Sequence, residues 1–426
     1  MRRRRIDRPV VVVGAGHAGL ATSYCLKQRG IDHIVLERDR VGQDWRDARW
    51  ASFRTVTPNW QCRLPGFPYA GADPDGFMSR DEVVAHLEAY AASFGPPLLE
   101  GVEVTELRHD AGGGFELATT AGECTAGQVV IATGGHHVAR IPRFAERLPS
   151  AIEQVSSADY ADPDDLPEGD VLVVGSGQSG CQIAEELHRA ARTVHLCVGE
   201  APRMPRSYRG REVAAWLEEL DYDDAPVRRH RLGEDGRRAA DPYVTGRDGG
   251  RDVDLRRLAR EGMRLYGRLV DIEDGVAMLA PDLTRNLDAA DAAADAIRDR
   301  IDGHVAARGI EAPPEPRTSA AWVPGVQPRM LDIEAAGIQS VVWCTGFDTD
   351  HRWVGAPIFD GRGRPSHERG VTDVPGLYVV GLPWLHTRSS GGFAGIARDA
   401  EHLAGLIEVG DRRATVTQLP RPAFGR

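Results

Sequence analysis

The sequence contains two copies of the motif G-x-G-x-x-G, and each copy directly follows an apolar run of strand length. GAGHAG at residues 14–19 follows the run 10–13, and GSGQSG at residues 175–180 follows the run 171–174. In this motif the first glycine forms a tight turn, the second lets the backbone approach a pyrophosphate, and the third lets the helix pack on the strand. One such motif arises often in loops, but two in this setting predict two dinucleotide-binding units in one chain.

The first copy has an acidic residue where a ribose would be bound. Residues 10–13 are all valine, as expected of a central parallel strand buried on both faces. A helical stretch follows the glycines and ends near Gly30, and the next strand ends in Glu37. An acid at this distance usually binds a ribose hydroxyl. Glu37 is therefore expected to anchor the adenosine part of the first dinucleotide.

The second copy differs after its next strand, residues 193–198. Glu200 comes late for the usual acidic position. Four arginines follow it: Arg203, Arg206, Arg209 and Arg211. Guanidinium groups bind a 2′-phosphate, which a ribose acid would repel. We therefore expect NADP(H) at the second site, with Arg203 and Arg206 as its first contacts, although a solvated loop explains any single arginine equally well.

Length and composition fit an ordinary globular protein with two or three cores. The chain has 426 residues with 42% hydrophobic and 27% charged residues, and its net charge of −11 gives no reason to expect nucleic-acid binding. The basic opening, residues 1–5, precedes a strand that is too short for a signal peptide, and no run reaches membrane-spanning length. We expect a cytoplasmic protein with no membrane insertion. The six cysteines and the histidines show neither a C-x-x-C pair nor a metal-binding spacing.

Two junctions rich in proline and polar residues divide the chain, at residues 162–169 and 311–316. Strands ending in Thr-Gly occur on both sides of the region between them, at residues 129–135 and 341–347. This arrangement predicts that the second unit is inserted into the first. The expected fold is α/β, with residues 1–164 and 317–426 forming the first Rossmann-like unit and residues 165–316 the second.

Helices are predicted over residues 80–94 and 288–302. The second stretch carries Ala294, Ile297 and Ile301 at helical spacing, is rich in Ala and Asp, and has the pattern of a surface helix.

Five segments together resemble the class B flavin-containing monooxygenases, including short bacterial and YUCCA-like members. They are the two glycine motifs, Gly42-x-x-Trp45, Ala132-Thr133-Gly134 and the sequence CTGF at residues 344–347. The resemblance spans essentially the whole chain. It implies FAD in the first site, NADPH in the second, and a flavin that holds O2 as a C4a-hydroperoxide to oxygenate a small molecule. Tyr160, where tryptophan would suggest a Baeyer–Villiger enzyme, favours oxygenation at N or S, and homodimers are common for this architecture.

The residues expected at the two cofactor sites follow from these motifs. Those expected to contact FAD are Gly14, Gly16, Gly19, Glu37, Gly42, Trp45, Thr133, Gly134, Gly346 and Gly381. Those expected to contact NADPH are Gly175, Gly177, Gln178, Ser179, Gly180, Arg203 and Arg206.

Asn59 is the candidate catalytic residue. In the resembling enzymes an asparagine that lines the flavin face precedes a segment rich in Phe and Pro, and Asn59 precedes such a segment at residues 64–68. The resemblance therefore implies that Asn59 hydrogen-bonds the peroxide or the nicotinamide amide. An asparagine that satisfies the turn after Pro58 is an equally good interpretation.

One departure from the family pattern keeps alternatives open. These enzymes usually have a histidine in the segment before the second nucleotide strand, and Ser156 stands in its place. Serine hydrogen-bonds but carries no charge. The alternatives are an NADPH-dependent flavin oxidoreductase or oxidase that does not oxygenate a substrate, and a non-catalytic flavoprotein that senses redox state or nucleotides.

Overall fold

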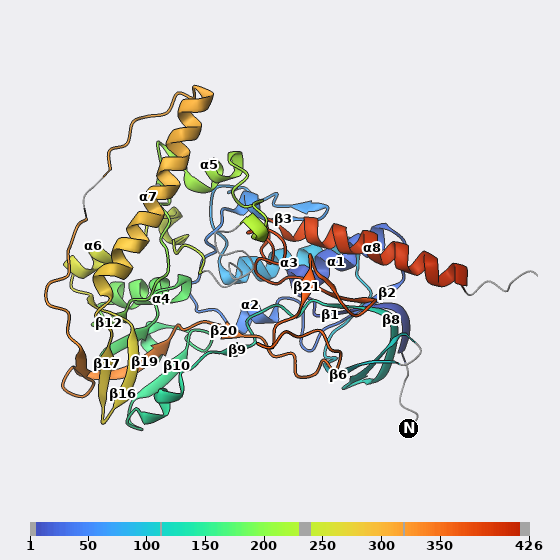
Figure 1. The fold of residues 1–426 in the computed structure, drawn as a ribbon, viewed down its shortest axis with the longest axis horizontal. Coiled ribbons are helices and arrows are strands. Elements are labelled where there is room, and N and C mark those ends of the chain that lie inside the picture. Colours follow the sequence, from blue (N-terminus) through green and yellow to red (C-terminus); the bar gives the residue numbers. More distant parts are fainter. Residues whose placement is uncertain (1–5, 111–112, 230–239, 318–319, 418–426) are drawn as a thin grey trace, which may run out of the picture.

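Two α/β units make up the computed structural model, which describes residues 6–110, 113–229, 240–317 and 320–417 (Figure 1). The first unit is built on a sheet with the strand order β21-β22-β23-β8-β1-β2-β5, and the antiparallel strands β7 and β6 extend from β8. Its strands are β1 (Ile6–Val13), β2 (His33–Leu36), β5 (Leu98–Leu99), β6 (Val104–His109), β7 (Phe115–Thr119), β8 (Gly122–Ile131), β21 (His367–Glu368), β22 (Val371–Thr372) and β23 (Leu377–Val379).

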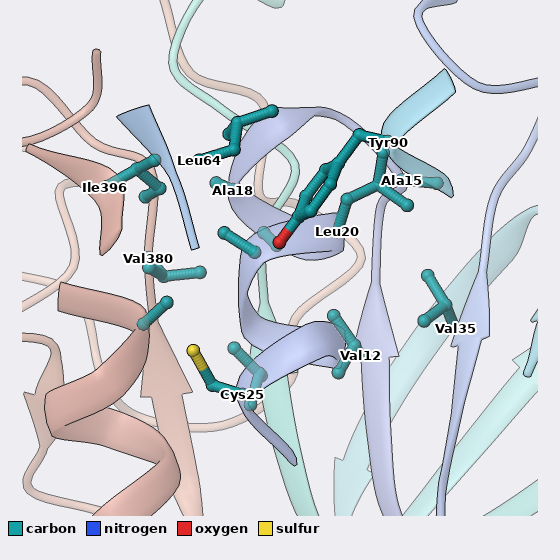
Figure 2. Packing of buried hydrophobic residues seen from close by; sticks show 14 of the residues in the cluster. Val12, Ala15, Ala18, Leu20, Cys25, Val35, Leu64, Tyr90, Val380 and Ile396 are labelled. Atoms are coloured by element: carbon teal, nitrogen blue, oxygen red, sulfur yellow. The ribbon is translucent and has the colours of Figure 1, made fainter. Parts of the chain in front are cut away.

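Strand β1 is buried on both faces, as its run of valines predicts. Val10 and Val12 pack in one core cluster, which also holds buried side chains of α1 (His17–Gln28), α3 (Arg80–Phe94) and α8 (Ile396–Thr417). Figure 2 shows part of this cluster around α1. Val11 and Val13 point the other way, into a cluster with residues of β6, β7 and β23. The parallel strands β2 and β8 flank β1 on either side.

The second unit is a fully parallel sheet with the order β10-β19-β11-β12-β15. Its strands are β10 (Glu153–Ser156), β11 (Asp170–Val174), β12 (Val194–Cys197), β15 (Arg264–Tyr266) and β19 (Ile338–Trp343). An antiparallel sheet of β16 (Leu269–Glu273), β17 (Val276–Leu279) and β18 (Met330–Asp332) lies beside it. Helix α4 (Gln178–Arg189) follows β11 as α1 follows β1.

The remaining elements are short ladders and connecting helices. The ladders pair β3 (Arg63–Leu64) with β4 (Phe67–Pro68), β9 (Val138–Ala139) with β20 (Phe347–Asp348), and β13 (Ser207–Tyr208) with β14 (Arg211–Glu212). The helices are α2 (Gln43–Asp47), α5 (Val213–Glu219), α6 (Leu255–Arg260) and α7 (Leu283–Arg308), with 3-10 turns η1 (Asn59–Gln61), η2 (Arg143–Arg147), η3 (Pro163–Asp165), η4 (Val227–Arg229) and η6 (Arg247–Gly249).

The topology confirms the insertion but shifts its limits. Strands β10 and β19 both belong to the second sheet, where β19 lies between β10 and β11. The second unit therefore spans at least residues 153–343 rather than 165–316. The chain returns to the first sheet only at β21 to β23. The predicted limits were wrong because the strand at 341–343 is apolar and ends in Thr-Gly, and the sequence does not reveal the sheet in which such a strand pairs.

Helix α7 confirms the helical spacing predicted over residues 288–302, and the helix is longer at both ends (Figure 1). It is a surface helix that buries one face against the second unit. Ile297 and Ile301 are buried in a cluster with Trp216 of α5 and Tyr208 of β13, and Ala294 is buried too. In the described part of the chain no helix is both long and apolar enough to cross a bilayer.

Candidate dinucleotide sites

The first glycine loop connects β1 to α1 with the geometry that its motif predicts. Gly14 has a φ of +104°, which disfavours any side chain, and Gly16 caps the N-terminus of α1 in an extended conformation. A Cβ atom at Gly19 would overlap the carbonyl oxygen of Gly14, so only glycine lets the helix approach the loop this closely. The free N–H groups at the start of α1 and the helix dipole therefore favour a pyrophosphate here.

Glu37 lies at the carboxyl end of β2 beside this loop. Its Oε2 accepts a hydrogen bond of 2.7 Å from the backbone N–H of Ala15, and its Oε1 accepts one of 3.0 Å from the N–H of Asp39. Burial raises the pKa of Glu37, whereas the two N–H donors lower it. A carboxylate fixed in this way next to the glycine loop is placed to accept hydrogen bonds from ribose hydroxyls.

Other residues expected at the first site gather at the same edge of the sheet. Thr133 and Gly134 follow β8, and Gly381 follows β23 with a φ of +78° and lies directly against Ala18 of α1. The hydroxyl oxygen of Thr133 is buried and has no hydrogen-bond partner among the residues that the structure describes, and the α-carbon of Thr133 borders the space beside Gly14. An orphaned buried hydroxyl beside a glycine loop fits a polar ligand that completes its hydrogen bonding.

Gly42 and Trp45 lie on a segment that contacts α3 and Phe393. Gly42 caps α2 in a left-handed conformation, with a φ of +73°, and lies against α3. The ring of Trp45 lies 5.9 Å from the ring of Phe393 (centroid to centroid), which in turn lies 5.0 Å from the ring of His17 in the glycine motif. The Nε2 atom of His17 lies 2.9 Å from the carbonyl oxygen of Gly391. These contacts bring the glycine-rich segment before α8 onto the first glycine loop.

Gly346 does not belong to this group. It follows β19, so it lies at the end of a strand of the second sheet. The backbone N–H of Cys344 donates to the carbonyl of Val174, just as the N–H of Ala132 donates to that of Val13. Gly346 is therefore the counterpart of Gly134 in the second unit, and its assignment to the FAD site is corrected.

The second glycine loop repeats the geometry of the first. Gly175 has a φ of +105°, Gly177 caps α4, and Gly180 packs against the carbonyl of Gly175. Gln178, which was expected to contact NADPH, uses its side chain within the protein. Its Nε2 donates to the carbonyl of Val244 at 2.6 Å, and its Oε1 accepts from the N–H of the same residue at 3.2 Å.

The two loops differ at one matched position. The N–H of Gly14 donates to the carbonyl of Leu36, and the N–H of Gly175 donates to that of Cys197, so the residue after Leu36 corresponds to the residue after Cys197. Glu37 therefore matches Val198, which is buried. The second loop therefore has valine at the position that Glu37 occupies in the first, so the carboxylate that would repel a 2′-phosphate is replaced there by an apolar side chain.

The predicted arginine contacts are already engaged by the protein. Arg203 forms an ion pair of 2.7 Å with Asp291 of α7. Arg209 and Arg211 pair with Asp302 and Glu219.

Arg206 is 5% exposed and lies between the two units. Its Nη1 donates to the carbonyl of Val56 and to Glu212, its Nη2 donates to the carbonyl of Thr245, and its guanidinium stacks 4.5 Å from the ring of Phe77. Arg206 therefore joins the units, and its assignment to the 2′-phosphate is corrected.

Arg285, at the start of α7, is a candidate that the sequence pattern did not reveal. Its side chain is 61% exposed and pairs at 2.9 Å with Glu200, just after β12. Arg285 and Glu200 are 85 positions apart in the sequence, so only the fold brings this guanidinium to the end of β12. An exposed ion pair of this kind is weak and opens at little cost.

The side chains of Asn59 and Ser156 both form hydrogen bonds within the protein. Both ends of the Asn59 amide bind backbone: Nδ2 donates to the carbonyl of Asp73 and Oδ1 accepts from the N–H of Met78, each at 2.9 Å. Ser156 ends β10, donates to Asp159 at 2.6 Å and accepts from the N–H of Ala158. The Asn59 side chain therefore joins the backbone at Asp73 to that at Met78, and it does not satisfy the turn after Pro58.

Comparison with known proteins identifies the family. A family model described as pyridine nucleotide-disulphide oxidoreductase matches residues 11–220. The CzcO-like oxidoreductase of Geobacillus kaustophilus is 34% identical over 398 residues, which cover 92% of this chain and 96% of that protein. This chain belongs to the family of CzcO-like oxidoreductases. Its membership of an oxidoreductase family confirms that it is an enzyme.

Two more proteins resemble this chain, one in part of its sequence and one in its fold. The indole-3-pyruvate monooxygenase YUCCA1 of Oryza sativa subsp. japonica is 34% identical over 182 residues, which cover 42% of this chain and 45% of that protein. A mutant flavin monooxygenase from Stenotrophomonas maltophilia has a similar fold, with a TM-score of 0.65 at 20% identity over 95% of this chain and 99% of that chain. The expected fold of two dinucleotide-binding units is confirmed, and the expected resemblance to monooxygenases is found in the sequence over 42% of this chain.

The cysteines of this chain are unsuited to thiol chemistry. All six lie in the described part of the chain, and all are free and buried. Burial raises the pKa of Cys62 and of Cys344 to about 12. Because the thiolate is the reactive form, thiols with such pKa values stay protonated and inert near neutral pH. These cysteines therefore have the properties of buried core residues.

Proposed function

We propose that this protein is an NADPH-dependent flavin monooxygenase that oxygenates a small molecule at nitrogen or sulfur. Its cofactors are FAD at the first glycine loop and NADPH at the second, and O2 is its second substrate. The observation that carries the proposal is the difference at one matched position, where Glu37 lies beside the first loop and Val198 beside the second. When bound, the reduced flavin supplies the activation of oxygen.

The residues of the first unit bind and orient the flavin cofactor in this proposal. The N-terminus of α1 holds the pyrophosphate, Glu37 holds the ribose, and the orphaned hydroxyl of Thr133 gains a partner. The rings of Trp45 and Phe393 exclude water from the same edge of the sheet. Arg49, whose guanidinium lies 5.0 Å from the Trp45 ring, adds positive charge beside these rings.

The residues of the second unit hold NADPH. The N–H groups at the start of α4 face the pyrophosphate, and the side chain of Gln178 fixes the neighbouring segment at Val244. When NADPH binds, Arg285 leaves its exposed ion pair with Glu200 and pairs with the 2′-phosphate. Arg206 acts indirectly, because it joins the segment around Val56 to the segment around Thr245.

A flavin oxidoreductase or oxidase that releases H2O2 is the second candidate. The observation that favours it is Ser156, a buried residue whose hydroxyl is used in a turn where the family usually has histidine. A non-catalytic sensor is disfavoured by the second glycine loop, whose geometry repeats that of the first.

The coupling of NADPH oxidation to oxygenation distinguishes these functions. The FAD-loaded protein is screened in 18O2 with small amines and thioethers while NADPH, H2O2 and labelled product are measured. The proposal predicts that a substrate lowers H2O2 release and gives product with one 18O atom per NADPH consumed. Stoichiometric H2O2 with every compound would favour the oxidase, and no consumption of NADPH would favour the sensor.

A further inference from the structure

A groove outside the two glycine loops has the properties of a small-molecule site. It lies between the segment 66–71, which contains β4, and helix α3, and its volume is about 560 Å³. Phe67, Tyr69, Met78 and His86 contribute to its lining. Sites for small ligands in proteins commonly have volumes of 300–1,000 Å³ and a mostly apolar lining with a few polar groups.

Three rings form an aromatic face in this groove. The ring centroid of His86 lies 5.2 Å from that of Phe67 and 6.2 Å from that of Tyr69. Offset or tilted rings at these separations attract another flat ring through their quadrupoles. The lining therefore favours a flat aromatic ligand over an extended aliphatic one.

His86 supplies a polar atom that lacks a partner. Its Nε2 is buried and makes no hydrogen bond within the described structure. Burial lowers the pKa of His86, so the imidazole is neutral near neutral pH. In a neutral imidazole one ring nitrogen donates and the other accepts, so Nε2 forms one hydrogen bond whose direction depends on the tautomer, and the uncharged ring does not attract an anion.

The carboxylate at the rim of the groove is already engaged. Glu82 accepts hydrogen bonds from the N–H of Ser79 at 2.7 Å and from Arg54 at 3.0 Å. Its carboxylate thus belongs to the capping box of α3 and to one ion pair, and it is not free to bind a ligand. The groove as a whole therefore favours an uncharged ligand.

The groove is connected to the first glycine loop through Phe393. The ring of Phe393 lies 6.5 Å from that of His86 and 5.0 Å from that of His17, which belongs to the glycine motif. One ring therefore separates the groove from the loop at which FAD is proposed to bind.

We propose that this groove binds an uncharged, flat aromatic molecule, and that the ring of His86 turns on binding so that its Nε2, buried in the free protein, makes one hydrogen bond to the ligand. The groove holds the aromatic part of the monooxygenase substrate next to Phe393, and this role in catalysis rests on the proposed function. The binding itself does not require turnover, so it can be tested separately.

Indole is a suitable probe because it is flat and neutral and has one N–H donor. Its affinity for the FAD-loaded protein is measured by calorimetry without NADPH, beside indene, which lacks the N–H, and indole-3-carboxylate, which is charged. Ala85→Trp adds a ring to an exposed position that lines the groove. Ala92→Trp adds the same ring to an exposed position on the same helix outside the lining, and serves as the control.

The proposal predicts that indole binds the wild type and Ala92→Trp equally and binds Ala85→Trp at least tenfold more weakly. His86→Phe keeps the ring and lowers the affinity for indole about fivefold, the effect of one hydrogen bond, with little change for indene. Equal binding of indole to Ala85→Trp and to wild type, or tighter binding of the charged probe, would overturn the proposal. A protein that binds indole in this way but is never reduced by NADPH would refute the proposed function alone.

Discussion

The Oε2 atom of Glu37 lies 2.7 Å from the backbone nitrogen of Ala15, and Val198 occupies the matching position of the second unit. The two units otherwise repeat each other closely, with φ values of +104° and +105° at Gly14 and Gly175. The difference between acid and valine therefore distinguishes two loops of the same shape. We assign FAD to the loop with the acid and NADPH to the loop without it.

Replacement of Glu37 is expected to weaken FAD binding selectively. Glu37→Ala removes a carboxylate placed beside the glycine loop, and we expect a loss of about tenfold in FAD affinity, the usual effect of a hydrogen bond to a charged group. Flavin fluorescence on titration of the apoprotein measures it. Asp39→Asn, at an exposed neighbouring position, should leave FAD affinity unchanged. Equal FAD affinity of Glu37→Ala and wild type would refute the role of this acid.

Arg206 is expected to control stability rather than the choice of cofactor. Arg206→Leu removes the ion pair with Glu212, whose carboxylate then keeps only its backbone donors, and removes a donor from the carbonyls of Val56 and Thr245. Breaking a pair with a buried guanidinium costs about 3 kcal/mol. Urea unfolding measures the free energy of unfolding. The control Arg108→Gln removes an exposed pair with Glu106 and should change this free energy by less than about 1 kcal/mol. A selective loss of NADPH over NADH in Arg206→Leu, without lower stability, would restore its predicted role at the 2′-phosphate.

Arg285 is expected to distinguish NADPH from NADH. Arg285→Gln removes an exposed guanidinium at the end of β12, so the KM for NADPH should rise about tenfold while the KM for NADH stays constant. Steady-state kinetics with both donors measures the ratio. Arg257→Gln removes another exposed arginine, paired with Glu261, and should change neither value. An equal effect of Arg285→Gln on both donors would contradict the assignment.

His351 is expected to make the protein less stable in acid. Burial, with His137 nearby, lowers the pKa of His351 to about 4, below the usual value of 6.5. Between these values the unfolded chain binds a proton that the folded protein does not. The free energy of unfolding therefore falls as the pH falls from 6.5 to 4, by at most about 3 kcal/mol, and is constant below that range.

The variant His351→Gln, which does not titrate, should remove much of this dependence. Denaturant unfolding at about pH 7 and about pH 4.5 measures the difference, which should be about 2 kcal/mol smaller in the variant. His109→Gln, at an exposed position, is the control and should behave as the wild type does. Equal dependence in His351→Gln and wild type would show that His351 is not the titrating group.

The glycine loops and helix α3 were predictable because their signals are local. Gly14 and Gly175 need positive φ values, and α3 begins at the predicted residue because Ser79 and Glu82 form a capping box. Gly346 was not predictable, because the sequence around it does not reveal which sheet its strand joins. Nor was Arg206, since its partners at Val56 and Thr245 come from segments far away in the sequence.

The central claim, FAD at the loop with Glu37 and NADPH at the loop with Val198, is tested most directly by anaerobic reduction of the FAD-loaded protein. The bleaching of flavin absorbance is followed after mixing with equal concentrations of NADPH or NADH. The account predicts full reduction by NADPH at a rate at least tenfold above that with NADH. Equal rates with both donors, or no reduction by NADPH, would contradict it.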